Sequence, residues 1–239
     1  MRIPLPNSSN LKDLGGLYLD LKTKTKEKQF IRSDHFLSIS HEEINYLANY
    51  GVKVIIDLRE EYQVRKYPDL LNVKPFIYYN VSLIEYNPSS IDLAQGVSLL
   101  DSYYTIINEN SNRIKKVFDV ILKHPHDCIL FHCFAGKDRT GLIAYLLYSI
   151  VQADFRDILA DYAATSIYIA PYVQKMCRQS ENFKKKIGFW NSDPDNLIQI
   201  NNYLINKFGS IENYLYSIGL TNADLSNIRY RFIETLKKS

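Results

Sequence analysis

The segment from residue 129 to residue 141 carries the side chains best suited to chemistry. His132 and Cys133 follow an apolar run with the character of a buried strand, and Arg139 lies six residues after Cys133. A cysteine where a loop enters a helix is favoured as a thiolate by the helix dipole and nearby cations, so its pKa should fall below the free value of about 8.5. The planar guanidinium of arginine can hold two oxygens of a phosphate. Together these residues predict nucleophilic attack by Cys133 on a bound phosphate group.

The remaining residues of this loop suit the binding of an anion. Ala135 and Gly136 are small enough for the chain to curl around a group of phosphate size, and the backbone N–H groups of residues 134–139 can hold its equatorial oxygens. Lys137 would add a second cation, which suits a highly charged head group such as an inositol phosphate; the alternative is a lysine that faces solvent. The predicted substrate-binding residues are Phe134, Ala135, Gly136, Lys137, Thr140 and His132.

Thr140 and His132 each have a more specific predicted role. Cys128 and Cys177 have no predicted role in the chemistry. Thr140 either donates a hydrogen bond to the thiolate and eases its departure in a second step, or simply caps the following helix. His132 is expected to brace the loop through hydrogen bonds and not to transfer protons. Cys128 lies within the preceding apolar strand and Cys177 within a predicted helix, so both are expected in the core.

A leaving oxygen needs a proton, so this chemistry calls for a general acid. Asp138 lies inside the loop itself, and Asp57 ends a second predicted strand whose tip should reach the same edge of the sheet. Both candidates stay open, with a preference for Asp57 because the neighbouring Arg139 should hold Asp138 ionised. Asp92, in a polar segment, is a weaker third candidate.

Other motifs for phosphate, metal or thiol chemistry do not match the sequence. A Walker loop requires glycine where Phe131 stands and serine or threonine where Asp138 stands. The chain has no Cys-x-x-Cys and no His-Glu-x-x-His, so a thioredoxin site or a zinc finger is not expected. The histidines show no metal-ligand spacing, and the predicted reaction needs neither a metal nor another cofactor.

Composition sets wider limits on the class of protein. The chain has 239 residues, 46% hydrophobic and 23% charged, which is ordinary for a globular protein. A net charge of +3, from 29 basic and 26 acidic side chains, gives no support for nucleic-acid binding. Three cysteines are an odd number, which argues against a closed disulfide framework.

The sequence does not predict stable membrane insertion. Its first residues lack the apolar core of a signal peptide, and the apolar run at 142–151 is well short of the ~20 residues that a membrane helix needs. A cytoplasmic location is therefore expected for the sequence as written, with secretion after removal of a signal left open. Lys184–Lys186 either meet an acidic membrane surface or are simply solvated, which is the more usual case. The sequence does not indicate an oligomeric state.

The elements that must position these residues alternate between strands and helices. Strands are expected at 17–21, 29–31, 52–58, 76–81 and 128–132. Helices are expected from a Ser40–Glu43 capping box to Gly51, at 99–123 with a break near 108–112, and at 140–152. From residue 154 nearly everything predicts helix, with segments at 195–208, 211–218 and 222–236. The alternation favours an α/β sheet covered on both faces.

From His132 to Gly141 the sequence reads His-Cys-Phe-Ala-Gly-Lys-Asp-Arg-Thr-Gly. It resembles the active-site loop of cysteine-dependent phosphatases, whose pattern is His-Cys-x5-Arg-Ser/Thr, and more closely that of a bacterial branch with HCxxGKDRTG. That branch is described as tyrosine phosphatases with dual-specificity and phosphoinositide activity. The segment Asn10–Gly16 is similar to the branch's Asn-Phe-Arg-Asp-Leu-Gly-Gly, with Leu11 and Lys12 as departures. Further matches, over residues 10–235 in all, are Arg32-Ser33, Asp57-Leu58-Arg59, Asp161-Tyr162, Phe208-Gly209-Ser210, Tyr214 and Ile218-Gly219-Leu220.

The resemblance implies a three-layer cysteine-phosphatase fold, with a central, mostly parallel sheet flanked by helices. Residues 1–239 would form one phosphatase domain, of which about 154–239 is a helical C-terminal part. The implied function is hydrolysis of phosphate monoesters through a phosphocysteine, on phosphotyrosine proteins and on phosphoinositides. Two alternatives stay open: a non-enzymatic module that binds a phosphorylated ligand, and sulfur-transfer chemistry on a similar loop.

Overall fold

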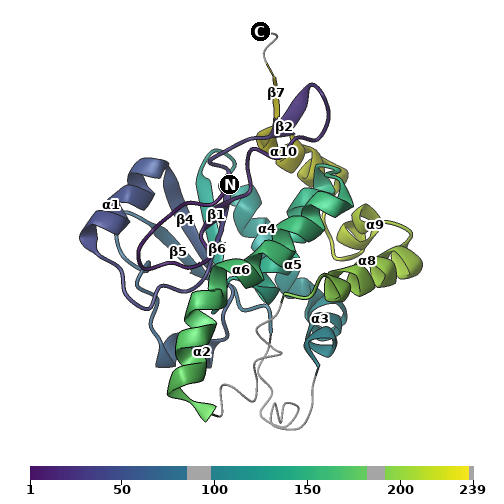
Figure 1. The fold of residues 1–239 in the computed structure, drawn as a ribbon. Helices are drawn as coiled ribbons and strands as arrows, with labels where there is room; N and C mark the ends of the chain where they lie inside the picture. The colour runs from purple at the N-terminus through teal and green to yellow at the C-terminus, as the bar shows by residue number, and fades with distance from the viewer. Residues whose placement is uncertain (85–97, 182–191, 237–239) are drawn as a thin grey trace.

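A five-stranded sheet lies at the centre of the structure, a computed structural model that describes residues 1–84, 98–181 and 192–236 (Figure 1). β1 at one edge pairs antiparallel with its neighbour, and the other four strands pair in parallel. The spatial order is β1 (Lys12–Asp13), β3 (Phe30–Ser33), β6 (Cys128–His132), β4 (Val52–Asp57) and β5 (Ile77–Asn80).

The register of the parallel strands brings three strand ends together. His132 at the end of β6 lies beside Asp57 of β4 on one side and beside Ser33 of β3 on the other. In parallel sheets, ligands bind outside these carboxyl ends. The expected placement of Asp57 and His132 at one edge of the sheet is therefore confirmed.

Helices cover both faces of the sheet and give the molecule three layers. α1 (His41–Tyr50) packs on one face, in a hydrophobic cluster with Ile55 and Leu130. α4 (Ser111–Lys123) and α5 (Asp138–Ile150) pack on the other face in a second, larger cluster. Figure 1 shows α1 on one side of the strands and α4 and α5 on the other. The expected α/β fold, a mostly parallel sheet flanked by helices, is confirmed.

Local signals in the sequence position α1 and the strand that follows it. The Ser40 hydroxyl accepts a hydrogen bond from the Glu43 N–H, and the Glu43 carboxylate accepts one from the Ser40 N–H. Gly51 ends the helix with a φ of 119°, in the left-handed region that glycine adopts easily. The chain then enters β4 directly, so the capping box and this glycine fix the start of the strand that ends in Asp57.

The N-terminal hairpin differs from the prediction. The strand expected at 17–21 is only partly present: Tyr18 forms an isolated antiparallel bridge with Lys24 of β2 (Thr23–Thr25), and residues 19–21 bend. The Asp20 carboxylate accepts hydrogen bonds from the N–H groups of Lys22 at 2.6 Å and Thr23 at 2.7 Å, which closes a tight turn. Leu17 and Leu19 pack partly buried against the core, whereas Leu21 is 98% exposed at the turn, so the pairing does not extend to it.

The C-terminal part is mostly helical, as predicted, but its last described element is a strand. The expected helix at 222–236 stops at Phe232, because Ile233–Thr235 form β7 and pair antiparallel with β2. The break expected within 99–123 is present, between α3 and α4. The remaining described helices are α2 (Glu61–Lys66), α3 (Leu99–Asn108), α6 (Phe155–Gln179), α8 (Pro194–Phe208), α9 (Ile211–Ser217) and α10 (Asn222–Phe232).

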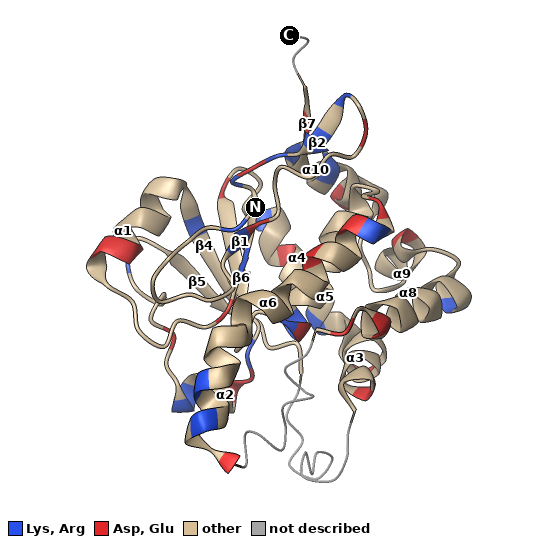
Figure 2. Ribbon diagram, in the orientation of Figure 1, with Lys and Arg blue, Asp and Glu red and all other residues tan. Residues whose placement is uncertain are grey.

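Charged residues of both signs are interspersed along the described ribbon (Figure 2). The chain carries 29 basic and 26 acidic side chains, and this near balance means that the charges relevant to chemistry must be sought locally. Among the described residues, no helix combines the length and the apolar character that crossing a membrane requires.

Candidate active site

The cysteine loop, defined here as residues 133–139, joins the end of β6 to the start of α5. β6 is buried along its whole length, so Cys133 emerges at the carboxyl edge of the sheet. α5 begins at Asp138, and the backbone N–H groups of its first turn have no acceptor within the helix. A buried strand followed by a helix N-terminus therefore places the cysteine where an anion is favoured.

The environment of the Cys133 thiol favours its ionisation. Cys133 is only 3% exposed, and burial alone would raise its pKa. Arg139, together with the hydroxyl and backbone N–H of Thr140, outweighs burial and lowers the pKa of Cys133 below its ordinary value. By contrast, burial raises the pKa of Cys128 to about 12, so that residue stays a thiol. Of these two buried cysteines, Cys133 is thus the one whose environment stabilises a thiolate.

Gly136 allows the loop to turn tightly against β3. Its φ is +64°, in the left-handed region that favours glycine, and a Cβ at this position would lie 2.4 Å from the carbonyl oxygen of Ser33. Both facts exclude a side chain at Gly136 without movement of the loop. The small residue that the sequence suggested is therefore needed for the loop's backbone path.

Arg139 extends from the first turn of α5 toward α2 (Glu61–Lys66). Its Nη1 donates to Gln63 Oε1 at 2.9 Å and lies 3.4 Å from Glu60 Oε1. Burial raises the pKa of Glu60, and Arg139 opposes that shift. The start of α2 thus orients the guanidinium that lowers the pKa of Cys133.

Asp57 is enclosed by hydrogen-bond donors. The Arg59 Nε lies 3.0 and 3.1 Å from its two carboxylate oxygens, and the Tyr78 hydroxyl donates to Oδ2 at 2.8 Å. Burial alone would raise the pKa of Asp57, but His132 and Arg59 hold it below its ordinary value. A buried carboxylate that stays ionised has no proton to give. This environment argues against the preference for Asp57 as the general acid.

Asp138 and Lys137 form an ion pair at the start of α5. Lys137 Nζ lies 2.7 Å from Asp138 Oδ1; the lysine side chain is 1% exposed and that of Asp138 is 28% exposed. The hydroxyl of Tyr103, from α3, lies 3.4 Å from the same oxygen. Lys137 is therefore not a solvent-facing lysine, which corrects that alternative. Asp138 is the carboxylate of the loop that a ligand can reach.

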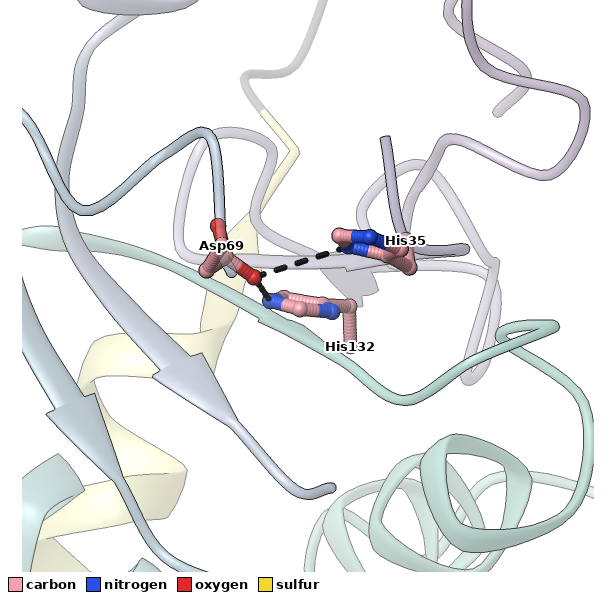
Figure 3. Close-up of side chains that lie close together, drawn as sticks. All are labelled: His35, Asp69 and His132. Carbon is pink, nitrogen blue, oxygen red and sulfur yellow. Dashed lines mark ion pairs between the residues drawn. The ribbon is translucent and has the colours of Figure 1, made fainter. Parts of the chain in front are cut away.

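His132 has a hydrogen-bond acceptor on each side of its ring, of which Figure 3 draws Asp69. Its Nδ1 lies 3.1 Å from the carbonyl oxygen of Cys133, and its Nε2 lies 2.8 Å from Asp69 Oδ2. Burial would lower the pKa of His132, but Asp69 and Asp57 raise it to about 9. At neutral pH both ring nitrogens then carry protons, so His132 holds the loop and does not act as a base.

His35, Asp69 and His132 also have one possible metal-ligand atom each within 4.8 Å of one another (Figure 3). Their surroundings do not suit a cation. The Arg59 Nη2 lies 3.1 Å from the same Asp69 oxygen, and a protonated His132 cannot ligate a metal. We interpret the cluster as an ion network that fixes His132 at the end of β6.

A cavity of about 250 Å³ opens beside the cysteine loop. Its walls include Phe134 and Ala135 from the loop, His35 from the segment after β3, and Tyr172 and Lys175 from α6. Aromatic and apolar surface therefore lies beside the first residues of the cysteine loop. A larger cavity of about 670 Å³, lined by residues of α4 and α10, contains no residue of the loop.

Three residues near the loop had no role in the sequence analysis. Asp69 comes from the irregular segment between α2 and β5, Gln63 from the short α2, and Tyr103 from α3. Each stands outside any motif, and only the packing of distant segments brings it to the loop, so no sequence signal identifies it. Asp92 and Lys184–Lys186, which the sequence analysis considered, lie outside the described residues.

Comparison with known proteins identifies the family to which the chain belongs. A family model described as the tyrosine phosphatase family matches residues 3–234. The chain belongs to the tyrosine phosphatase family. Membership supports phosphotyrosine hydrolysis, and it agrees with the resemblance carried by the cysteine loop.

Two relatives carry the name of a tyrosine-protein phosphatase. A tyrosine-protein phosphatase of Nostoc commune is 27% identical over 222 residues, which cover 84% of this chain and 73% of the relative. A putative tyrosine-protein phosphatase of Cupriavidus necator is 24% identical over 163 residues, which cover 64% of this chain but only 59% of the relative.

Two solved structures show a weak likeness. Both are of TpbA from P. aeruginosa, one being a Cys-to-Ser variant in complex with pTyr. Each is 16% identical to the chain over 62% of its length, covering 75% and 83% of the TpbA chains with TM-scores of 0.31 and 0.32. Likeness at this level adds no argument to the family assignment.

Proposed function

We propose that this tyrosine phosphatase family member hydrolyses phosphate monoesters of tyrosine through a covalent phosphocysteine. The observation that carries the proposal is the lowered pKa of Cys133, caused by Arg139 and Thr140 at the start of α5. The thiolate attacks phosphorus, so that a P–S bond forms as the P–O bond to the tyrosyl oxygen breaks. Arg139 and the backbone N–H groups of the loop stabilise the charge on the equatorial oxygens.

Asp138 is the general acid in this proposal. The departing tyrosyl oxygen takes a proton from Asp138, which lies in the loop and is partly exposed. In the second step water attacks phosphorus, Asp138 takes its proton, and the P–S bond breaks to release phosphate. The Thr140 hydroxyl stabilises the thiolate as it leaves.

Phosphotyrosine is the substrate class that the site supports best. Phe134 and Tyr172 place aromatic surface in the cavity beside the cysteine loop, where a substrate ring can pack. Phosphoinositide hydrolysis was predicted from the resemblance and from Lys137 as a second cation. The Lys137 ammonium is buried against Asp138, which weakens that argument, so phosphoinositides come second in this proposal.

Two other functions predict different behaviour. A module that only binds phosphorylated ligands would not need a cysteine with a lowered pKa beside a reachable carboxylate. A sulfurtransferase would not need Arg139 paired with a general acid. We further propose that residues 1–239 act as one phosphatase domain, because the C-terminal helices α8, α9 and α10 contribute to the same core as α5.

Turnover of a phosphotyrosine peptide by wild type, Cys133→Ser and Cys177→Ser tests the proposal. Cys177 is half-buried in α6, so its replacement is the matched control. We expect wild type and Cys177→Ser to release phosphate, and Cys133→Ser to bind the peptide without turnover. Binding without turnover by wild type would instead support the binding module. Sulfur transfer from thiosulfate by wild type would support the sulfurtransferase.

A further inference from the structure

Two buried side chains hold the back of the cysteine loop, and the proposed reaction does not use them. The Asn10 amide donates to the carbonyl oxygens of Ala135 at 3.2 Å and Gly136 at 2.9 Å. The Arg32 Nη2 donates to the carbonyl oxygens of Gly136 at 2.8 Å and Lys137 at 3.3 Å. Asn10 is 0% exposed and Arg32 is 1% exposed, so both side chains make these bonds out of contact with water.

These bonds fix the direction in which the loop amides point. In a trans peptide the C=O group and the N–H group of the next residue point in opposite directions. Holding the carbonyls of residues 135–137 toward Asn10 and Arg32 turns the N–H groups of residues 136–138 to the opposite, inner side of the loop. Successive N–H groups that share one side form a concavity that binds anions.

Arg32 is itself held in place by a buried ion cluster. Its Nη1 donates to Asp161 Oδ2 in α6 at 2.6 Å, and Lys12 Nζ lies 3.0 Å from Asp161 Oδ1. Burial would raise the pKa of Asp161, but Lys12 and Arg32 hold it below its ordinary value. Because Asp161 neutralises Arg32, the second amino group of the guanidinium is left to donate to uncharged carbonyls. The cluster thus ties β1, β3 and α6 to the back of the loop.

We propose that Asn10 and Arg32 are positioning residues that orient the loop N–H groups toward the phosphoryl group before it binds. The proposal rests on the phosphatase function proposed above. It also gives a role to Asn10 and Arg32, which lie in the segments Asn10–Gly16 and Arg32-Ser33. Both segments match the phosphatase branch, and the proposed reaction does not use them.

The test compares Asn10→Leu, Arg32→Lys and Lys12→Met with wild type. Leucine has the same branched arrangement of heavy atoms as asparagine but no hydrogen-bond donor. Asn10→Leu therefore removes the two bonds to the loop and keeps the branching of the side chain. Arg32→Lys keeps a charge for Asp161 but loses the guanidinium fork. Lys12→Met disturbs the same ion cluster without touching a loop carbonyl. The measurements are kcat and KM on p-nitrophenyl phosphate, the inhibition constant of inorganic phosphate, and the thermal midpoint.

We expect Asn10→Leu and Arg32→Lys to weaken phosphate inhibition and lower kcat/KM by about 10- to 100-fold. Lys12→Met leaves every bond to a loop carbonyl in place, so we expect it to lose much less of either. Phosphate inhibition at the wild-type level in folded Asn10→Leu and Arg32→Lys would overturn the proposal, whatever the thermal midpoints. If Asn10→Leu does not fold, Arg32→Lys alone gives the result. A wild type without turnover would count against the proposed function instead, and calorimetry of phosphate binding would still test the positioning role.

Discussion

Two carboxylates lie near the nucleophile, and their surroundings divide their roles. Asp57 is buried between Arg59 and Tyr78 with a lowered pKa, whereas Asp138 is partly exposed in the loop. A general acid matters most when the leaving group is a poor one. We therefore predict that Asp138→Asn lowers kcat about 100-fold or more on phosphotyrosine, but much less on p-nitrophenyl phosphate, whose leaving group is more acidic.

The variant Asp57→Asn, measured on the same two substrates, is the comparison for Asp138→Asn. It removes the partner of a buried guanidinium, so we expect a lower thermal midpoint with the two substrates affected alike. The assignment is reversed if Asp57→Asn produces the leaving-group dependence and Asp138→Asn does not.

The ion pair of His132 and Asp69 predicts a dependence of stability on pH. The folded pKa of His132, about 9, lies above its ordinary 6.5, so the pair's contribution is full below pH 6.5 and is lost as the pH rises through about 9. The difference in unfolding free energy between wild type and Asp69→Asn should shrink by up to about 3 kcal/mol across that range. Chemical denaturation at several pH values measures it, and a difference that does not vary with pH would contradict the ion pair.

At the scale of residues, the sequence predicts the groups that share the loop and misses those that join it from elsewhere. Cys133 and Arg139 follow from one contiguous string, because their spacing along the chain also sets their spacing around an anion. The general acid does not follow from the string. Arg59 lies only two residues from Asp57, but Tyr78 reaches Asp57 only once β5 pairs with β4, and the lowered pKa of Asp57 depends on its burial in the folded sheet.

At the scale of elements, the turn at Gly136 determines the shape of the cysteine loop. Gly136→Ala would strain a φ of +64° and place a Cβ against the Ser33 carbonyl. We expect kcat/KM to fall about 100-fold or more as the loop moves. Gly209→Ala is the control: its φ is +82° at the end of α8, away from the loop, so strain should cost roughly 1–2 kcal/mol of stability with kcat unchanged. Equal activity of both variants would refute the loop's dependence on this glycine.

Elements with local signals were predictable, and those made by distant pairing were not. Ser40, Glu43 and Gly51 delimit α1 through contacts within a few residues. β2 and β7 have no such signal, because each exists through pairing with a segment near the other end of the chain, as in Thr23 beside Thr235. The same limit applies to Gln63, which reaches Arg139 only after α2 has packed against the loop.

At the scale of the whole molecule, the buried Lys137 bears on substrate choice. Its ammonium contacts Asp138 and its side chain is 1% exposed, so we propose that it acts on Asp138 and not on a second phosphate of the substrate. Lys137→Met should therefore lower turnover of phosphotyrosine and phosphoinositide substrates by similar factors. A side-by-side rate panel measures this, and a much larger loss on phosphoinositides would restore Lys137 as a head-group ligand.

The central claim is that the phosphoryl group passes through Cys133. Rapid acid quench of wild type during turnover of a phosphotyrosine peptide, followed by mass spectrometry of the peptide that contains Cys133, tests it directly. The account predicts a phosphoryl group on Cys133 that forms and decays at rates compatible with turnover, and neither this adduct nor phosphate release in Cys133→Ser. Continued phosphate release by Cys133→Ser would contradict the account.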